Sequence, residues 1–136
     1  MKKTASEVIN DLFKVIKSSP ISKEVAGSVY KAGQRPLNSL KEDIVINFLT
    51  GTADQIQTGV VNVNVFVPNI DNSSGNTVCN TSRCRAIESK MGGWVDGLED
   101  FDGYRLSLDE MIRTMPYEDG KQHFVNVRLK FDYLTF

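Results

Sequence analysis

The sequence predicts an α+β domain in which a mainly antiparallel sheet of about five strands carries two helices on one face. Apolar residues recur at helical spacing in segments 4–19 and 81–98, whereas alternating apolar and polar residues mark strands in other segments. Most neighbouring strands are joined by connections of hairpin length, which favour antiparallel pairing. The chain has 136 residues, the length of one ordinary domain, so the expected order over residues 1–136 is α-β-β-β-α-β-β.

The first helix is predicted by a capping box and an apolar stripe. Thr4 and Glu7 have the spacing at which each side chain can bond to the backbone N–H of the other. Ser18-Ser19-Pro20 ends the helix, because proline does not continue one, and residues 21–27 are expected to form a linker. The apolar stripe consists of Val8, Leu12, Val15 and Ile16, widened by Ile9 and Phe13.

One short strand and one central strand are expected next. Residues 28–31 form the short strand and lead into a turn or extended arm at 33–39. Pro36 in this arm cannot donate to a strand ladder and keeps Arg35 out of helical angles. The segment 44–49 is apolar on both faces for most of its length, which predicts a central place in the sheet.

The segment 59–68 has the clearest strand pattern in the chain. Alternate valines from Val61 to Val67 form one face, while Asn62 and Asn64 lie on the other. A slip of one residue would bury both asparagine side chains, and each would cost about 1–3 kcal/mol if left unpaired. The register of this strand is therefore expected to be strongly set.

A polar loop and a second helix are expected after this strand. Residues 69–80 are rich in turn-forming side chains and should project into solvent as a contact loop. Thr81 or Ser82 is expected to cap the helix that follows. Gly92-Gly93 indicates either a bend or early end of this helix near Gly92, or close packing of the glycines against the sheet.

Two further strands complete the predicted sheet. Residues 104–108 alternate in polarity, and Asp109-Glu110 then disturbs the phase before 111–115, which suggests a bulge or bend. Residues 116–120 supply a turn. The segment 125–133 is apolar on one face and polar on the other, so it should pair with 104–115 as a long hairpin.

Composition and charge exclude several classes of protein. Sixteen Lys and Arg against 17 Asp and Glu give a net charge of −1, whereas a dedicated nucleic-acid binder needs an excess of basic residues. No apolar run approaches the roughly 20 residues that cross a bilayer, so no membrane partner is expected. Glu7, Asp11 and Lys14 occupy the region where a signal peptide would be apolar, so the protein is expected to start in the cytosol.

The chain offers few residues for catalysis or for metal binding. It has no phosphate-binding glycine loop and no H-E-x-x-H pair, and its one histidine, His123, is expected at an edge or turn. Cys79 and Cys84 supply too few ligands for zinc, so they are expected to be reduced thiols, with a local disulfide as the alternative. We therefore expect no enzyme activity, no cofactor and no resident metal.

The alternative with catalytic chemistry is a metal-dependent nuclease. Glu42 and Asp43 open the strand at 44–49, and Arg128 or Lys130 could neighbour them across the sheet. Nucleases of this class combine carboxylates that hold Mg²⁺ with a basic residue that stabilises phosphoryl-transfer charge. A small host-directed binding protein is a further alternative.

Several segments favour an interaction role instead. Arg35-Pro36-Leu37-Asn38 reads as a stiff extended arm, and Leu134-Thr135-Phe136 ends the chain with exposed apolar groups. An open antiparallel sheet has edges that must be paired, covered or charged. Together these features favour a protein that buries edges and termini against copies of itself.

The order of these segments resembles a family of bacteriophage proteins. The arm and strand from Gly33 to Ile46, the Val-Asn-Val-Asn-Val strand at 61–65, the flanking helices and the final hairpin are similar to the tail-terminator or tail-completion proteins of tailed phages. The chain is also similar to small proteins of phages and prophages from Bacteroides-like hosts. The polar insertion at 69–80 and the paired cysteines depart from the family pattern, which leaves open a different neck or connector protein as partner.

The resemblance implies a structural virion protein, assembled in the host cytoplasm, that forms a homo-oligomeric ring, commonly a hexamer. Such a ring lies in the neck or at the head-proximal end of the tail, ends tail-tube growth and joins the tail to the connector or portal adaptor. DNA passes through its lumen without specific binding, which suits a net charge near zero. We expect the arm at 33–43 and the loop at 69–80 to make the contacts. The candidate interface residues are Arg35, Pro36, Asn38, Lys41, Asp71, Asn72, Asn76 and Phe136.

Overall fold

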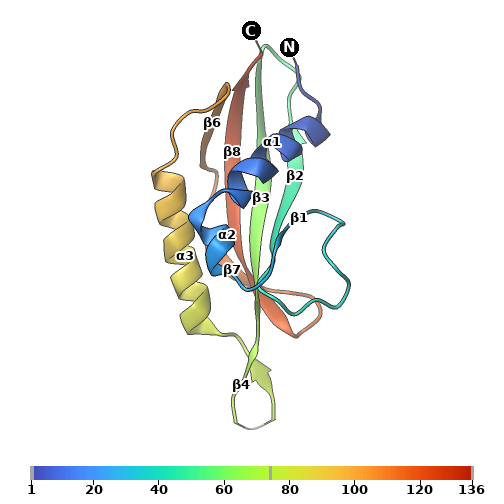
Figure 1. Ribbon diagram of the computed structural model, residues 1–136, viewed down its shortest axis with the longest axis vertical. Coiled ribbons are helices and arrows are strands. Elements are labelled where there is room, and N and C mark those ends of the chain that lie inside the picture. Colours follow the sequence, from blue (N-terminus) through green and yellow to red (C-terminus); the bar gives the residue numbers. More distant parts are fainter. Residues whose placement is uncertain (1, 74, 136) are drawn as a thin grey trace.

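The structure is a computed structural model that describes residues 2–73 and 75–135, and its fold confirms the α+β class. Three helices lie on one face of a six-stranded sheet, and a separate two-stranded hairpin extends from one end of the molecule (Figure 1). The helices are α1 (Ala5–Lys17), α2 (Pro20–Glu24) and α3 (Thr81–Asp96). The strands are β1 (Val29–Lys31), β2 (Ile44–Gly51), β3 (Ile56–Pro68), β4 (Ile70–Asp71), β5 (Thr77–Val78), β6 (Tyr104–Leu108), β7 (Arg113–Pro116) and β8 (Gln122–Leu134).

The main sheet has the strand order β1-β2-β3-β8-β6, and β7 pairs with β8 at the same edge as β6. Every pairing is antiparallel except the one between β1 and β2, which is parallel. For the described residues, the expectation of about five strands and two helices was therefore too low by one strand in the main sheet and by one helix, and it did not include the β4–β5 hairpin. The coarser prediction of a mainly antiparallel sheet with helices on one face holds.

The strands β3 and β8 form the centre of the sheet. They pair along their whole lengths, from Ile56 opposite Leu134 to Pro68 opposite Gln122. The prediction that the 44–49 strand is central is wrong, because β2 has β1 beside it only at Ile44–Ile46. Its apolar character on both faces ends at a bulge after Phe48, where Leu49 is 46% exposed.

The predicted register of β3 is confirmed. Val61, Val63 and Val65 are fully buried beneath the helices, in the one apolar core that the described residues share. Asn62 and Asn64 lie on the opposite face, where the amide of Asn126 on β8 donates to the side-chain oxygens of both, at 3.2 and 2.7 Å. Because the three asparagine side chains hydrogen-bond to one another, their placement on this face does not incur the free-energy cost of unpaired polar groups.

The first helix begins as predicted, and a second helix follows it unexpectedly. The Thr4 hydroxyl accepts from Glu7 N at 3.3 Å, and the Glu7 carboxylate accepts from Thr4 N at 3.1 Å. The segment 21–27 is not simply a linker, because Pro20 occupies the first turn of α2 and Ile21 is buried. Proline has a preset backbone angle that suits the start of a helix, so it ends α1 and begins α2.

Two details of α3 differ from the sequence prediction. Asn80, rather than Thr81 or Ser82, caps the helix, since its side-chain oxygen accepts from Arg83 N at 3.2 Å. The helix also continues through Gly92 and Gly93 to Asp96, so it has no early end. A side chain at Gly93 would meet nothing within 4 Å, so close packing against the sheet does not require a glycine there.

The interruption expected at Asp109-Glu110 separates β6 from β7. β6 pairs with β8 from Leu129 to Tyr133, and β7 pairs with it from His123 to Asn126. Asp109 N donates to Arg128 O at 2.8 Å and continues the ladder of β6 by one residue. The two short strands therefore share one edge of β8 end to end.

Candidate functional site

Three connecting segments gather at the end of the molecule opposite the termini (Figure 1). They are the arm at 32–43, the β4–β5 hairpin and the turn at 117–121 between β7 and β8. Most side chains in these segments are exposed, as connecting segments usually are, and such segments carry most binding functions. This loop end contains all the described candidate interface residues and is the candidate functional site.

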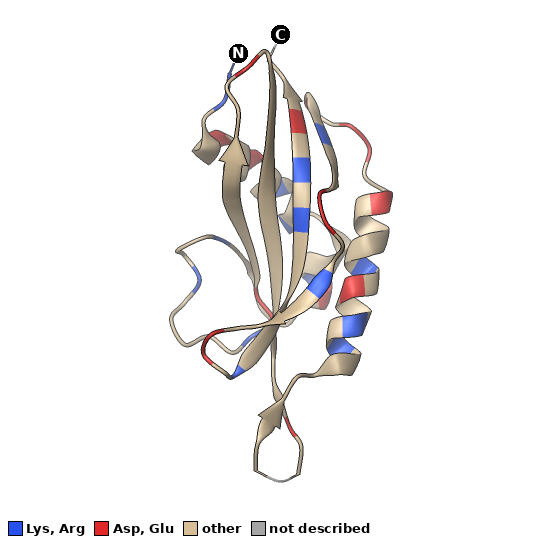
Figure 2. Ribbon diagram, turned by 180° about the vertical axis from the view of Figure 1, so that it is seen from behind, with Lys and Arg blue, Asp and Glu red and all other residues tan. Residues whose placement is uncertain are grey.

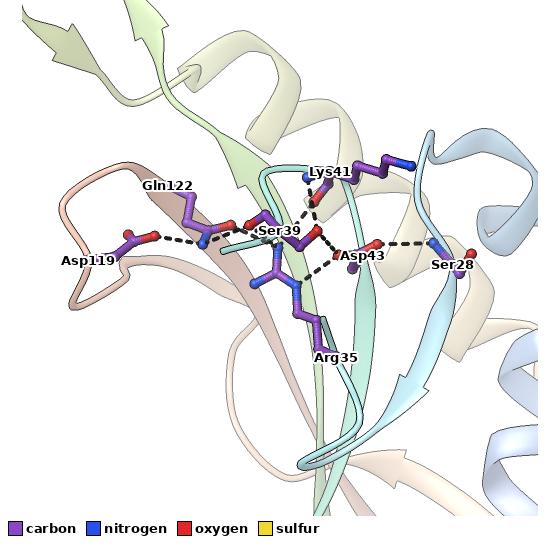
Figure 3. A network of polar contacts seen from close by, with 7 residues as sticks. All are labelled: Ser28, Arg35, Ser39, Lys41, Asp43, Asp119 and Gln122. Carbon is purple, nitrogen blue, oxygen red and sulfur yellow. Dashed lines mark hydrogen bonds and ion pairs between the residues drawn. The ribbon is translucent and has the colours of Figure 1, made fainter. Parts of the chain in front are cut away.

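A buried polar network fixes the arm against the sheet (Figure 3). Arg35 Nε donates to Asp43 Oδ2 at 2.8 Å, and Ser39 Oγ donates to the same oxygen at 2.6 Å. Ser28 N donates to the other carboxylate oxygen at 3.1 Å. Asp43 is only 1% exposed, so this carboxylate depends on protein donors rather than water.

The guanidinium of Arg35 also joins the arm to β8. One terminal nitrogen donates to the backbone oxygens of Ser39 and Lys41, each at 3.2 Å, and to Gln122 Oε1 at 2.9 Å. Gln122 in turn donates to Asp119 Oδ2 at 2.8 Å, in the turn before β8. The arm and the 117–121 turn are thereby joined by hydrogen bonds through Gln122.

Aromatic packing supports the same contact from the open face of the sheet. The guanidinium carbon of Arg35 lies 4.0 Å from the centre of the Phe66 ring, a cation–π distance. Phe66 meets Tyr117 edge-on at 5.1 Å between centroids and lies 5.5 Å from Phe124. These three rings therefore cover the part of the open sheet face that lies nearest the loop end.

The environment of Asp43 keeps its carboxyl group ionised. Burial alone would raise the pKa of Asp43, but the hydrogen bonds from Arg35, Ser39 and Ser28 outweigh it and hold the pKa below its usual range. Gly27 leaves the necessary space, because a Cβ there would overlap Asp43 Oδ1 and lie 2.5 Å from the backbone oxygen of Glu42. The network therefore requires this glycine.

The candidate interface residues of the arm divide into two groups. Arg35 turns inward and shapes the arm, whereas Pro36, Asn38 and Lys41 are exposed. Leu37 at the tip is 93% exposed, although it was not among the candidates. Asn38 has a φ of 62°, a left-handed angle that asparagine tolerates better than most residues. The arm thus presents an exposed apolar side chain, Leu37, between Pro36 and Asn38.

The candidate residues of the 69–80 segment lie in the projecting hairpin. Asp71 pairs with Thr77, Asn72 N donates to Asn76 O at 3.0 Å, and Asp71 Oδ1 accepts from Ser73 N at 3.2 Å. Ile70 and Val78 keep substantial exposure at the base of the hairpin. Phe136 lies outside the described residues.

The two carboxylates of the nuclease alternative, Glu42 and Asp43, pair with different arginines. Glu42 accepts two hydrogen bonds from Arg83 on α3, at 2.7 and 2.9 Å, while Asp43 pairs with Arg35. Arg128 lies instead beside Asp109, with 3.0 Å between Nε and Oδ2 in a geometry that makes no hydrogen bond. In residues 2–73 and 75–135, no three His, Cys, Asp or Glu side chains lie close enough together to share a metal ion.

The face of the sheet turned away from the helices is open and unevenly charged (Figure 2). β2 and β3 contain no charged residue, whereas β6, β7 and β8 carry four basic residues and one acidic residue, namely Arg105, Arg113, Arg128, Lys130 and Asp132. Arg105 pairs with Asp100 at 3.2 Å, and Arg128 lies between Asp109 and Glu110. Basic residues therefore predominate in these three strands, and acidic residues of the adjoining connections pair with two of them.

The remaining candidate residues have local partners. The expectation that His123 is an edge or turn residue is wrong, because it lies within β8 and pairs with Val67 on β3 and with Pro116 on β7. Its Nδ1 lies 2.7 Å from Asn69 Oδ1. Cys79 and Cys84 are free thiols with 4.0 Å between their sulfur atoms. Burial, with Cys79 next to it, raises the pKa of Cys84 to about 12, so this thiol stays protonated at neutral pH.

Sequence reasoning missed Ser39 as a partner of Asp43, and it missed Gln122 and Phe66 as partners of Arg35. Gln122 lies 87 positions after Arg35, and no local pattern connects them. The one available signal was the buried polar group at the start of β2, because an aspartate before an apolar strand needs a donor.

Two comparisons with known proteins found no relative of this chain. No protein-family model matches the chain, and no curated protein matches it significantly. No helix in the described part of the chain is both long and apolar enough to span a bilayer. The function must therefore be argued from the geometry.

Proposed function

We propose that this chain is a structural virion protein of a tailed bacteriophage and forms a ring at the neck or at the head-proximal end of the tail. In this role it ends tail-tube growth, joins the tail to the head connector and lets DNA pass through the lumen. It is assembled in the host cytoplasm and acts without catalysis or a cofactor. The proposal combines the resemblance of the segment order with the surfaces that the fold leaves uncovered.

The observation that carries the proposal is the unfinished sheet. From Asn47 to Gly51, β2 has β3 on one side and no described strand on the other. β6 forms the opposite edge, and among the described residues it has only an isolated bridge from Phe101 outside it. Uncovered strand edges are suited to pairing with another chain, and heterologous contacts between subunits can close a ring.

The loop end supplies the contacts that the proposal needs along the tail axis. The Arg35–Asp43 network bonds the arm to the sheet and leaves Leu37 exposed on the arm, and the hairpin projects from the same end of the molecule. An exposed apolar side chain on a hydrogen-bonded arm is suited to a contact with the connector or the tail tube. The net charge of −1 is compatible with free passage of DNA.

Electron microscopy and a nuclease assay test the proposal together. The purified protein, alone or with its connector, should form rings with a central opening, and it should leave linear DNA intact in the presence of Mg²⁺. A monomer that cuts DNA, and that loses this activity when Glu42 is changed to Gln, would instead support the nuclease. In a phage genome the gene should lie beside the portal, connector and tail-tube genes, and its deletion should yield filled heads without attached tails.

A further inference from the structure

Cys79 and Cys84 occupy two positions that the start of a helix brings together. Asn80 caps α3, so Cys79 is the residue before the cap and Cys84 is the fourth residue of the helix. Apolar side chains at these two positions often pack against each other and fix the angle at which the chain enters the helix. Here both side chains are thiols, and their sulfur atoms lie 4.0 Å apart.

Only a short approach separates this contact from a covalent bond. The sulfur atoms of a disulfide are about 2.05 Å apart, so the two thiols must approach each other by about 2 Å. Rotation of a cysteine side chain about its Cα–Cβ bond moves the sulfur atom by a distance of this order. The first turn of α3 holds Cys84 in place, since its N–H donates to Asn80 O at 2.9 Å.

The two thiols differ in their access to solvent. Cys84 is only 2% exposed and belongs to the core, whereas Cys79 is half-buried. A pocket of about 220 Å³ opens beside them, and it is lined by Cys79, Thr81, Cys84, Arg85, Glu88 and Thr114. A small molecule in solution therefore reaches the sulfur of Cys79 before that of Cys84.

The environment of Cys84 suits it to the second step of a thiol reaction. Burial is the largest cause that raises the pKa of Cys84 to about 12, and the neighbouring Cys79 adds to the rise. A buried, protonated thiol does not attack a molecule outside the protein. Once the sulfur of Cys79 is bonded to another sulfur, it carries no thiolate charge, so Cys84 becomes easier to deprotonate beside it.

We infer that Cys79 and Cys84 form a thiol-oxidation site, which a low-molecular-weight disulfide such as oxidised glutathione converts to an intramolecular disulfide. The thiolate of Cys79 attacks one sulfur of the small disulfide, and one thiol molecule leaves. Cys84 then attacks the Cys79 sulfur of the mixed disulfide, and the second thiol molecule leaves. The protein loses two electrons and two thiol protons, and the small disulfide is reduced to two thiols.

The new bond would fasten the projecting hairpin to α3. Cys79 directly follows β5, and α3 starts immediately after it (Figure 1). The other end of the hairpin is already held, because Asn69 N donates to Lys121 O at 3.0 Å. The site does not depend on the proposed function, which adds only the occasion: thiols stay reduced during assembly in the cytoplasm and meet an oxidising medium after release.

Titration of the purified full-length protein with reduced and oxidised glutathione tests the site. After quenching and alkylation of the remaining thiols, the protein is digested with trypsin. Cleavage after Arg83 separates Cys79, in the peptide 42–83, from Cys84, in the dipeptide 84–85. Only a disulfide holds these two peptides together, so their joint mass identifies the bond.

The folded protein should yield the linked peptides. The equilibrium constant for closing the disulfide should be at least about tenfold larger than in urea, because the fold holds the two sulfur atoms together. Cys84→Ala should accumulate a glutathione adduct on Cys79, and Cys79→Ser should leave the buried Cys84 unmodified. Hydrogen exchange at residues 70–72 and 76–78 should slow by about threefold or more in the oxidised protein.

Equal equilibrium constants in the folded protein and in urea would overturn the inference, because closeness in sequence alone would then explain the bond. A folded protein that keeps a glutathione adduct without linked peptides would also overturn it. Modification of Cys84 in Cys79→Ser as fast as that of Cys79 in the parent would contradict the order of the steps. Unchanged exchange would contradict the tie to the hairpin. The parent measurements need no substitution, so they decide the question even where a variant does not fold.

Discussion

Arg35 and Asp43 form an ion pair, with 2.8 Å between Nε and Oδ2, that fastens the 32–43 arm to the residue before β2. The same guanidinium bonds to Gln122 on β8, so one side chain connects two loops that are remote in sequence. The pair therefore fixes the position of Leu37, the most exposed large apolar residue among those described. The contribution of this pair to the stability of the fold and the role of the loop end in assembly can be measured separately.

Replacing Asp43 by Ala should destabilise the protein strongly. The change leaves Arg35 and the Ser28 N–H without their buried acceptor, and removing one member of a buried pair costs about 3–5 kcal/mol. Urea unfolding at neutral pH measures the loss. Glu118→Ala, an exposed change in the neighbouring turn, should alter the free energy of unfolding by less than about 0.5 kcal/mol. Equal effects of the two changes would contradict the role of the pair.

Acid should weaken the same contact. The pKa of Asp43 is lower in the folded protein than its unfolded value of about 3.9, so its stabilising effect is present above that value and is lost as the pH falls below it. The free energy of unfolding should therefore fall as the pH drops from about 4 through the lowered pKa of Asp43. Asp43→Asn, which cannot ionise, should show a shallower fall over this interval, and an identical slope would count against the assignment.

A pair of glycine substitutions tests the space around Asp43. Gly27→Ala places a methyl group against the Asp43 carboxylate and the backbone of Glu42, so it should destabilise the fold by about 2 kcal/mol or more. Gly93→Ala is the matched control, because its methyl group meets nothing within 4 Å and alanine favours the helix by about 1 kcal/mol. Thermal unfolding should shift in opposite directions for the two variants, and a shift in the same direction would contradict this account.

The parts of the fold that depend on local pattern were predictable from the sequence. Alternate valines in β3 gave its register, and the Thr4–Glu7 spacing gave the start of α1, because both signals lie within a few residues. The interruption between β6 and β7 was visible as a change of phase at Asp109. In each case a single physical preference determined the local structure.

The rest depends on tertiary contacts that no short window contains. β2 has a buried strand's composition, but its second half is exposed because β1 is short and the arm leaves the sheet. In the sequence, Arg35 looks like an exposed residue of a polar loop, because its partners Gln122 and Phe66 are distant along the chain and lie beside it only in the folded protein. Pro20 correctly predicted the end of α1. That it also begins α2 was not predicted from the sequence, although proline suits the first turn of a helix as well as the position after one.

Removing the tip of the hairpin should impair assembly while leaving the monomer folded. Replacing residues 71–77 by two glycines removes β-hairpin residues that are largely exposed and outside the core. The free energy of unfolding should change by less than about 1 kcal/mol, since shortening a surface loop alters chain entropy only slightly. Sedimentation of the variant with and without its connector measures assembly. Complexes formed as readily as those of the parent would reject a contact role for the hairpin.

The mass of the protein in solution tests most directly whether sister chains complete the sheet. Light scattering across a wide range of concentrations should give one species whose mass is a whole-number multiple of 15.2 kDa greater than two. A mass of 15.2 kDa at every concentration, with the connector present as well as without it, or a dimer that never grows further, would contradict the account.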